Sequence, residues 1–393
     1  MKIGILGGGV GGLSAAIALK LKGFDVDVYE RHDATSEIGA GIVCWPNAGF
    51  VLEQLGLLEQ VKMVAGPLNR MNRYCEQGDS LGELDITELN RLTGYSSYAI
   101  LRRDLMRALL YRVNELNVPV HYGCEAAELS ETKNSSVQVK FKNELCIAPD
   151  LVIGAEGRMN SISRSYVNGT NNPIYQGFIN WIGVYESNEP LFPELSVGDY
   201  WGVGQRFGVV PVSNHKAYWA GAVTANSIQK KNPKEYRQEL EQIFSEWPGV
   251  IPKLIAETPE TQINKIYVHD HDPIDKWHKN NVVLIGDAAH AALPTSGQGA
   301  CQALEDSWHL AECVAEARGN LEQALPKFTQ IRAEKTKAII QGGRNIASSI
   351  FNDDPIFCQQ RNEASKNTDF HSAAKGMAEL WLSGLPRTSF TSI

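Results

Sequence analysis

The sequence contains few cysteines, and they follow no functional spacing. Its 393 residues include seven cysteines, without the Cys-x-x-Cys pattern of zinc sites or dithiol redox motifs. The thiols are therefore expected to be free, as in a cytoplasmic protein. A membrane-spanning segment is missing as well, because no run of about 18 apolar residues is free of charges and turn formers. Integral membrane association is not expected.

Long basic runs are also absent. The net charge is −8, with 45 acidic and 37 basic residues, so no nucleic-acid-binding surface is expected and a small molecule is the favoured partner. The apolar N-terminus imitates a secretory signal peptide, but six glycines lie between Gly4 and Gly12. Glycines at this density break a signal helix, so we expect a cytoplasmic location.

The composition that is present suits a large folded protein. The chain is 43% hydrophobic and 21% charged, which excludes a disordered or collagen-like protein. At roughly 100–200 residues per domain, the length predicts two domains or one domain with a large insertion.

A dinucleotide-binding pattern begins the chain. An apolar strand over residues 2–6, a helix over 13–21 and a strand over 24–29 form a βαβ unit, and the loop GGGVGG satisfies G-x-G-x-x-G. The first glycine makes a tight turn, the second lets the backbone approach a pyrophosphate, and the third lets helix and strand pack closely. The predicted cofactor contacts in this loop are Gly7, Gly9, Val10, Gly11 and Gly12.

A carboxylate ends the second strand. Glu30 follows the fingerprint at the spacing where an acidic residue accepts hydrogen bonds from the ribose hydroxyls of the adenosine half. Arg31, next to it, is a further predicted cofactor contact. These features predict a bound dinucleotide without separating FAD from NAD.

A second candidate segment lies late in the chain. It has a buried strand over 282–285, then Gly286 and Asp287, a loop, and a helix from about Gln298. This segment resembles the GD motif of the class A FAD-dependent monooxygenases, the family that includes para-hydroxybenzoate hydroxylase. The resemblance implies that Asp287 binds the ribityl chain of FAD and that the loop lies against the isoalloxazine ring. The loop residues assigned to the cofactor in this way are Pro294, Gly297, Gln298, Gly299 and Ala300.

Two more segments carry the same resemblance. Residues 150–164 are similar to the family's DG motif, which touches the FAD pyrophosphate region and is implicated in NAD(P)H binding, with Glu156 in place of the usual aspartate. Arg102, in ILRRDL, matches the family arginine that contacts the flavin, and Arg103 competes with it for this role.

The order of these motifs implies an α/β fold. A Rossmann-like FAD-binding domain is expected to be discontinuous, with an antiparallel β-sheet substrate domain inserted into it and helices at the C-terminus. The expected boundaries are 1–70, 98–172 and 268–345 for the FAD-binding domain, 71–97 and 173–267 for the substrate domain, and 346–393 for the C-terminal tail.

The middle of the chain is rich in β-formers and aromatic residues, in stretches separated by turn signals, which predicts an antiparallel sheet. Two interpretations of its aromatic residues stay open: they form the core of the sheet, or together they line a pocket for a flat aromatic substrate. The residues concerned are Trp181, Trp201, Phe207, Tyr218 and Trp219.

Two residues in this sheet are candidate catalytic groups. Arg206 lies in an otherwise apolar strand, where a buried cation is costly unless it is paired or faces an anionic ligand. The local sequences WPNAG and INWIG, with Arg206 and Tyr218, resemble the bacterial FAD-dependent urate hydroxylases, which implies catalytic roles for both side chains. Those enzymes carry an aspartate where this chain has Thr295, so we expect the reaction class rather than urate itself to be shared.

The resemblance also implies the reaction. Since the chain has one dinucleotide fingerprint, FAD is expected to bind tightly and NADPH or NADH transiently. Reduced flavin would capture O₂ as a C4a-hydroperoxide and hydroxylate a small aromatic or purine-like substrate. An epoxidase or antibiotic-modifying monooxygenase on the same scaffold, and a non-catalytic dinucleotide-binding protein, remain alternatives. His290 is interpreted as a packed histidine or a general base, no metal is expected, and the sequence does not indicate the oligomeric state.

Overall fold

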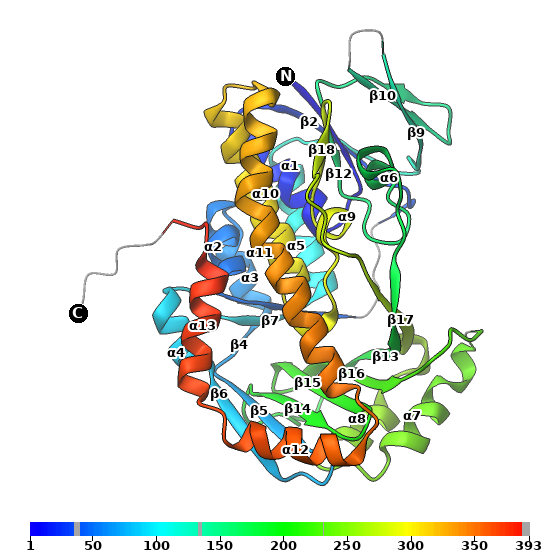
Figure 1. Ribbon diagram of the computed structural model, residues 1–393, viewed down its shortest axis with the longest axis vertical. Coiled ribbons are helices and arrows are strands. Elements are labelled where there is room, and N and C mark those ends of the chain that lie inside the picture. Colours follow the sequence, from blue (N-terminus) through cyan, green and yellow to red (C-terminus); the bar gives the residue numbers. More distant parts are fainter. Residues whose placement is uncertain (35–39, 133–135, 231, 387–393) are drawn as a thin grey trace.

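The computed structural model describes residues 1–34, 40–132, 136–230 and 232–386. Two large sheets dominate it (Figure 1). The first has the strand order β18-β19-β12-β1-β2-β8, and all of its neighbours are parallel except β18 and β19. Its strands are β1 (Lys2–Leu6), β2 (Asp25–Tyr29), β8 (Val120–His121), β12 (Leu151–Gly154), β18 (His278–Lys279) and β19 (Val282–Leu284).

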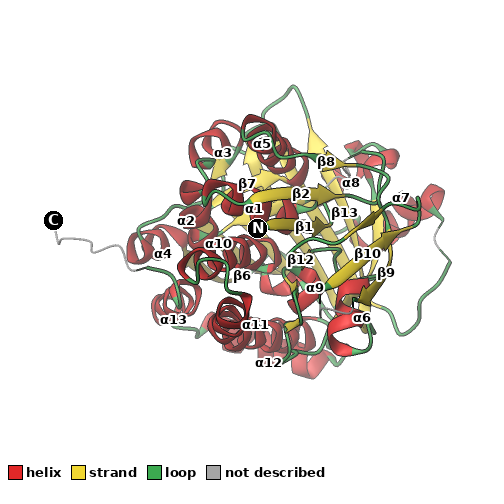
Figure 2. Cartoon of the chain, turned by 90° about the horizontal axis from the view of Figure 1, so that it is seen from above, coloured by secondary structure: helices red, strands yellow, loops and turns green. Residues whose placement is uncertain are grey.

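Helices cover one face of this sheet and a small three-stranded sheet covers the other (Figure 2). The helical layer is built from α1 (Val10–Leu21), α5 (Arg102–Glu115) and α10 (Gly299–Glu316). The small sheet contains β9 (Ala126–Glu131), β10 (Val137–Phe141) and β11 (Cys146–Ile147). The predicted Rossmann-like architecture is confirmed. Helix α1 begins earlier than expected, because the Gly9 carbonyl already accepts the first helical hydrogen bond, from the Leu13 amide.

The second sheet has seven strands in the order β17-β13-β16-β15-β14-β5-β6. Its pairs are antiparallel except β14 and β5, which run parallel. The strands are β5 (Arg70–Cys75), β6 (Ser80–Asp85), β13 (Ile174–Glu186), β14 (Val197–Trp201), β15 (Gln205–Ser213), β16 (Lys216–Thr224) and β17 (Asn264–Asp270). The expected insertion of a mainly antiparallel sheet into the nucleotide-binding fold is therefore confirmed.

The two faces of the second sheet have different partners. On the outer face, Trp181, Phe207 and Trp219 are at most 2% exposed and form a core with helices α7 (Tyr236–Phe244) and α8 (Ile251–Glu257). The pocket interpretation is therefore wrong for these three residues. Trp201 and Tyr218 have the opposite strand parity and lie on the inner face, toward the six-stranded sheet.

A small sheet and short helices fill the space between the two large sheets. The small sheet is made of β3 (Gly41–Cys44), β7 (Tyr98–Leu101) and β4 (Gly66–Pro67). The helices beside it are α2 (Pro46–Gln54), α3 (Leu58–Val64) and α4 (Ile86–Thr93), and α6 (Ile162–Asn168) and α9 (Asp287–His290) lie on the opposite side of the nucleotide-binding sheet (Figure 2).

Helix α11 (Leu321–Ile350) runs along nearly the full height of the molecule and joins its two halves (Figure 1). Arg344 on this helix donates to both carboxylate oxygens of Asp270 on β17, at 2.7 and 2.9 Å. Asp270 is fully buried, so its charge is neutralised by this ion pair. Within the described ranges no cluster suited to a metal ion is found.

The tail forms two helices, α12 (Pro355–Lys366) and α13 (Phe370–Leu382). Helix α12 lies under the edge of the second sheet, and α13 rises beside α4 toward α2 (Figure 1). The ring of Trp381 packs 4.8 Å from that of Trp45, between ring centroids. Of the described helices, none has the length and hydropathy needed to cross a membrane.

A buried charge cluster anchors α11 and the tail to the nucleotide-binding half. Arg332 donates to Glu305 at 2.6 Å and to Asp306 at 2.8 Å, and all three side chains are 0% exposed. Lys335 donates to Glu305 and to the Trp381 and Ser383 carbonyls. Burial lowers the pKa of Lys335 to about 8, although Glu305 opposes the shift.

Removing the central cation should destabilise the protein strongly. Arg332→Met leaves two buried carboxylates without their shared partner, and breaking a buried pair in this way costs about 3–5 kcal/mol. Glu334→Ala, at an exposed position on the same helix, should change the free energy of unfolding by less than about 0.5 kcal/mol. Denaturant unfolding of both variants measures the difference, and equal midpoints would contradict the assignment.

The cysteines provide a second test of the fold. Only Cys146 is exposed, and the other six thiols are buried and free; burial raises the pKa of Cys44 to about 12. Native protein treated with a thiol reagent at pH 8 should therefore show one rapidly reacting group, and Cys146→Ser should show none. Denatured wild-type protein should titrate seven thiols, and fewer would indicate a disulfide.

Candidate active site

The glycine loop leaves room for a ligand at the start of α1. A Cβ atom on Gly12 would lie 1.9 Å from the Gly7 carbonyl oxygen, and Gly7 itself has a φ of +108°. A Cβ on Gly9 would meet no atom within 4 Å. No side chain caps α1, so its first N–H groups, including those of Val10 and Gly11, are available to an anion.

Glu30 lies directly against this loop. Its Oε2 accepts from the Gly8 amide at 2.6 Å, and its Oε1 accepts from the His32 amide at 3.0 Å. The side chain of Arg31 is exposed, and its Nε donates to His32 at 3.2 Å. The carboxylate of Glu30 is thus held beside the glycine loop, whereas Arg31 points to solvent.

Charged residues from three segments converge next to the loop. Arg158 donates to Asp287 at 3.2 Å, and a Cβ on Gly299 would lie 3.9 Å from the same carboxylate. Burial lowers the pKa of Arg102, and the charges of Asp287 and Glu30 oppose that shift, so this guanidinium lies near both carboxylates. Arg103, which competes with Arg102 for the cofactor role in the sequence, forms an ion pair with Glu186.

The loop before α10 is fixed from two sides. A 3₁₀ turn (Pro294–Ser296) leads to Gly297, which has a φ of +63° and accepts through its carbonyl from Trp45 Nε1 at 3.0 Å. On the other side, the Thr295 hydroxyl donates to the Gly343 carbonyl of α11 at 2.7 Å. The amides of Ser296 and Gly297 are bonded within the turn, and no residue from Pro294 to Gly297 carries a carboxylate.

The start of α10 contains further candidates. Gln298 is 1% exposed, and its Oε1 accepts from Asn47 and Gln302, while its Nε2 has no hydrogen-bond partner. Gly299 and Ala300 form the first turn of the helix, which lacks a side-chain cap. An uncapped helix start beside a glycine loop suits a ligand that carries partial negative charge.

Glu156 has a structural role in this segment. Its carboxylate accepts from the Ser163 amide and hydroxyl at 2.9 and 2.7 Å and from the Ser161 hydroxyl at 3.1 Å. Burial raises the pKa of Glu156, and these hydrogen bonds oppose the shift. Glu156 therefore fixes the start of α6, and the neighbouring Arg158 is the side chain that reaches Asp287. Arg158 was not predicted, although it lies inside the same motif.

Arg206 lies on the inner face of the second sheet. Its Nε donates to Asp199 at 2.6 Å, and the second oxygen of Asp199 accepts from Trp201 Nε1 at 2.9 Å. The Arg206 side chain is 26% exposed and that of Asp199 is 7% exposed. The aspartate thus fixes the plane of the guanidinium and leaves its terminal N–H groups for other acceptors.

Tyr218 lies on the same face, with its ring against Gly41 of β3. A Cβ on Gly41 would overlap its ring, at 1.7 Å from Cδ1, so glycine is needed there for the tyrosine to fit. Burial raises the pKa of Tyr218 well above its usual value, and nearby Cys44 and Cys301 add to this effect. The phenol therefore stays protonated, and its neighbour Cys301 lies in the first turn of α10.

Asn180 completes the polar groups of this face and was not predicted. It pairs with Ala222 across the sheet, and Ala222 pairs with Arg206 on its other side, so both polar side chains point to the same face. Asn180 is 7% exposed, and its Oδ1 has no hydrogen-bond partner. Such an orphan acceptor suits a ligand N–H.

His290 is a packed residue, so the general-base interpretation is wrong. The ring is 3% exposed, bonds to Asp306 at 2.5 Å and stacks on Trp277. The charges of His290 and Arg332 outweigh burial and lower the pKa of Asp306 to about 2. The buried pair of His290 and Asp306 therefore stabilises the segment that follows β19.

These observations fit a bound dinucleotide. The uncapped start of α1, the open space at Gly9 and the carboxylates of Glu30 and Asp287 supply sites for a pyrophosphate and for two sugar-like chains. The sequence profile of the FAD binding domain family matches residues 1–342. The chain belongs to this family. It binds FAD and is a FAD-dependent monooxygenase.

Similar proteins cover almost the whole chain. An aurachin C monooxygenase/isomerase of Stigmatella aurantiaca is 31% identical over 342 residues, which is 87% of this chain and 88% of that protein. A FAD-dependent urate hydroxylase of Klebsiella pneumoniae is 29% identical over 389 residues, covering 98% and 99%. The crystal structure of Klebsiella pneumoniae HpxO with FAD and uric acid matches with a TM-score of 0.90 and 29% identity, covering 98% and 97%.

The glycine loop yields a test of cofactor binding. Gly9→Ala places a methyl group where the protein has open space, so the variant should unfold like wild type yet retain far less FAD after purification. Gly12→Ala forces its Cβ onto the Gly7 carbonyl and should lose about 1–3 kcal/mol of stability. Gly342→Ala, on α11 with open space around it, is the control for both. Normal flavin content in Gly9→Ala would argue against a pyrophosphate at this loop.

Proposed function

We propose that this FAD-dependent monooxygenase hydroxylates a small anionic heteroaromatic ring, held between the inner sheet face and the flavin loop. The observation that carries the proposal is the arrangement of Arg206, Tyr218 and Asn180 on one face of the sheet, with the Tyr218 ring against Gly41 of β3. Relatives named as urate hydroxylase and 6-hydroxynicotinate 3-monooxygenase act on heteroaromatic compounds, which supports the same class here.

The overall reaction consumes O₂ and NADPH or NADH. A ring C–H becomes C–OH, the second oxygen atom leaves as water, and the nicotinamide is oxidised. Bound FAD supplies the acceptor for the hydride and the centre at which O₂ is activated. The protein's own part is to bind and orient the ring, exclude water and set the ring's charge.

Each polar side chain of the inner face has a distinct task. The guanidinium of Arg206, oriented by Asp199, lowers the pKa of an acidic ring and stabilises the electron-rich anion that is hydroxylated. The protonated phenol of Tyr218 donates a hydrogen bond to a ring oxygen or nitrogen. The Oδ1 of Asn180, buried without a partner, accepts a ring N–H and so favours a heterocycle over a plain phenol.

The cofactor contacts complete the proposal. Gly7, Gly9, Val10, Gly11 and Gly12 would hold the pyrophosphate of FAD, Glu30 and Arg31 the adenosine half, and Arg102 and Asp287 the ribityl chain and the parts next to it. The segment with Pro294, Gly297, Gln298, Gly299 and Ala300 would hold the isoalloxazine ring. At the position where the urate hydroxylases carry an aspartate, this loop has Thr295, which is bonded to α11. The loop therefore offers the substrate no carboxylate, which favours a substrate other than urate.

The role of Arg206 can be tested by removing its charge. Arg206→Gln should retain FAD but lose about 10- to 100-fold in kcat/KM, since it removes a charged hydrogen bond to the substrate. The assay is substrate-stimulated NAD(P)H oxidation with a product mass gain of one oxygen, over a screen of purines, pyridine carboxylates and phenols.

The matched control is Lys216→Gln. It removes the same charge from the same sheet, at the far end of β16, where Lys216 faces Glu186 at 3.8 Å. Equal activity of Arg206→Gln and this control would remove Arg206 from the site, and a screen in which no compound stimulates oxidation would overturn the proposed function.

A further inference from the structure

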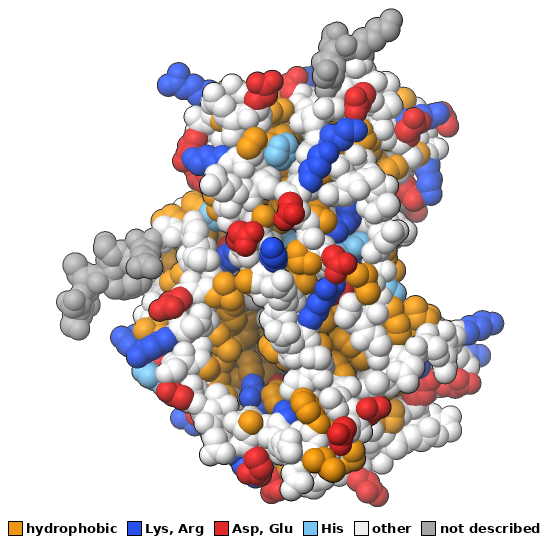
Figure 3. Space-filling view, in the orientation of Figure 1, with side chains coloured by type: hydrophobic (Ala, Val, Ile, Leu, Met, Phe, Trp, Pro, Cys, Tyr) orange, Lys and Arg blue, Asp and Glu red, His pale blue; other side chains and the backbone are white. Residues whose placement is uncertain are grey.

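A chamber opens on the inner face beside Trp201, the strand neighbour of Arg206, on the side of the tail helices. It has a volume of about 430 Å³ and lies between β5, β14, the end of α11 and helix α12. The lining residues are Arg73, Trp201, Ser349, Phe357, Gln360, Arg361, Ala364, Ser365 and Thr368. Figure 3 shows this face hollowed between α13 and α11, with apolar and basic side chains in the hollow.

The chamber is positively charged. Its lining includes two arginines and no carboxylate. The nearest acidic residue, Asp199, is already engaged by Arg206 and Trp201. A neighbouring cavity of about 370 Å³ shares Trp201 and Arg361 but is lined by three carboxylates, so the excess of positive charge is particular to the first chamber.

The two arginines differ in their free hydrogen-bonding capacity. Arg361 donates to the Ser349, Ile350 and Gly202 carbonyls and to Asn362, and so spends its donors on the protein. Arg73 donates through Nη1 to Ser365 at 2.9 Å, and its buried Nε has no partner. Arg73 therefore retains donors for an anionic ligand.

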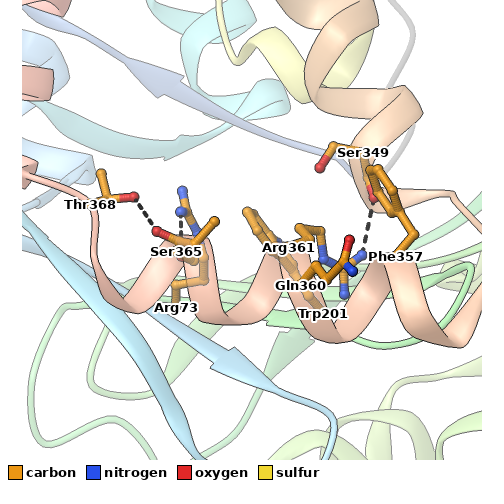
Figure 4. Close-up of a pocket in the computed structure, with 9 residues that line it drawn as sticks. Arg73, Trp201, Ser349, Phe357, Gln360, Arg361, Ser365 and Thr368 are labelled. Atoms are coloured by element: carbon orange, nitrogen blue, oxygen red, sulfur yellow. Dashed lines mark hydrogen bonds between the residues drawn. The ribbon is translucent and has the colours of Figure 1, made fainter.

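The guanidinium of Arg73 is held rigidly in place. Its Cζ lies 4.1 Å from the centroid of the Trp201 ring and 5.5 Å from that of Phe370. Figure 4 shows Arg73 at one end of a row of side chains along α12, with Phe357 near the other end. A planar cation fixed between aromatic rings is preorganised for a carboxylate or a similar planar anion.

The chamber lies on the same sheet face as the proposed ring site. Arg206 and Trp201 are direct neighbours across β15 and β14, and Asp199 bonds to both. Arg73 lies one strand further, opposite Asp199 in the β14–β5 register. Adjacent strands lie about 5 Å apart, so one small molecule reaches from Arg206 to Arg73.

We propose that this chamber binds an anionic side arm of the substrate, a carboxylate or a similar group, which Arg73 holds while the ring lies at Arg206. This inference rests on the proposed function and narrows it. Besides the anionic ring held at Arg206, the substrate carries a side arm with a second anionic group. NAD(P)H also carries anionic groups. The experiment therefore distinguishes binding of NAD(P)H in the chamber from binding of the substrate there.

The experiment measures binding of defined probes to the purified holoenzyme. The probes are 6-hydroxynicotinate, 6-hydroxypyridine-3-acetate and 3-(6-hydroxypyridin-3-yl)propanoate, which in their pyridone form carry the ring N–H expected at Asn180; each is compared with its neutral amide by the change in flavin absorbance. Wild type should prefer a longer acid over its amide by about 10- to 100-fold, as expected for one charged hydrogen-bonded contact. Arg73→Gln should abolish that preference, with unchanged flavin content and unchanged KM for NADH and NADPH.

Two further variants protect the test against a folding defect. Ala364→Trp adds bulk at an exposed lining position on α12 and should weaken the longest acid selectively. Arg70→Gln removes a charge from the same strand as Arg73, at a side chain that is 59% exposed, and should leave every probe unchanged.

Three results would overturn the inference. One is equal affinity of wild type for each acid and its amide. Another is an acid preference that Arg73→Gln and Ala364→Trp both retain. The third is a rise in the KM for NADH or NADPH in Arg73→Gln without any change for the acids, which would assign the chamber to the reductant. Each leaves the proposed function standing if another compound still stimulates NAD(P)H oxidation in an Arg206-dependent manner.

Discussion

The cofactor site depends on three parallel strands that end side by side. Strands β1, β12 and β19 pair in that order, although β19 follows β12 only after five of the seven strands of the second sheet, β13 to β17. Their carboxyl ends bring together the glycine loop, the segment with Arg158, and Asp287. Loops at the carboxyl ends of a parallel sheet converge on one crevice, so residues far apart in the sequence form one binding site.

This pairing also determines where the second sheet lies. The chain leaves the nucleotide-binding half after β12 and must return to place β19, so the sheet between them is held at both ends. Arg344 and the buried Asp270 fix the returning strand against α11. As a result, one face of the second sheet packs in a hydrophobic core with α7 and α8. The other face is directed toward the half of the molecule that contains the loop before α10.

The sequence predicts best where a backbone requirement restricts the residue type. The Gly7–Gly12 loop was predictable because a side chain at Gly12 would collide with the backbone, and Asp287 because it follows a buried strand and precedes a glycine loop. Strand parity relative to the core was not readable from the sequence, so the roles of Trp181, Phe207 and Trp219 stayed open until the strand register separated the two faces.

Partners contributed by distant segments could not be predicted for a related reason. Asp199 matters because it lies across β14 and β15 from Arg206, and Arg73 because β5, from an earlier part of the chain, pairs in parallel with β14. Neither relation leaves a local pattern. A charged residue inside an apolar strand is the one signal that the sequence offers. It identified Arg206 as a candidate but did not indicate that Asp199 is its partner.

The hydrogen bonds of the Lys335 ammonium group join parts of the chain that are synthesised at different times. This group lies buried in the nucleotide-binding half, yet two of its acceptors are the carbonyls of Trp381 and Ser383, near the end of the chain. Until those residues have emerged from the ribosome, this charge lacks its final acceptors. A chain that stops before Trp381 would therefore bury this ammonium group with two acceptors fewer.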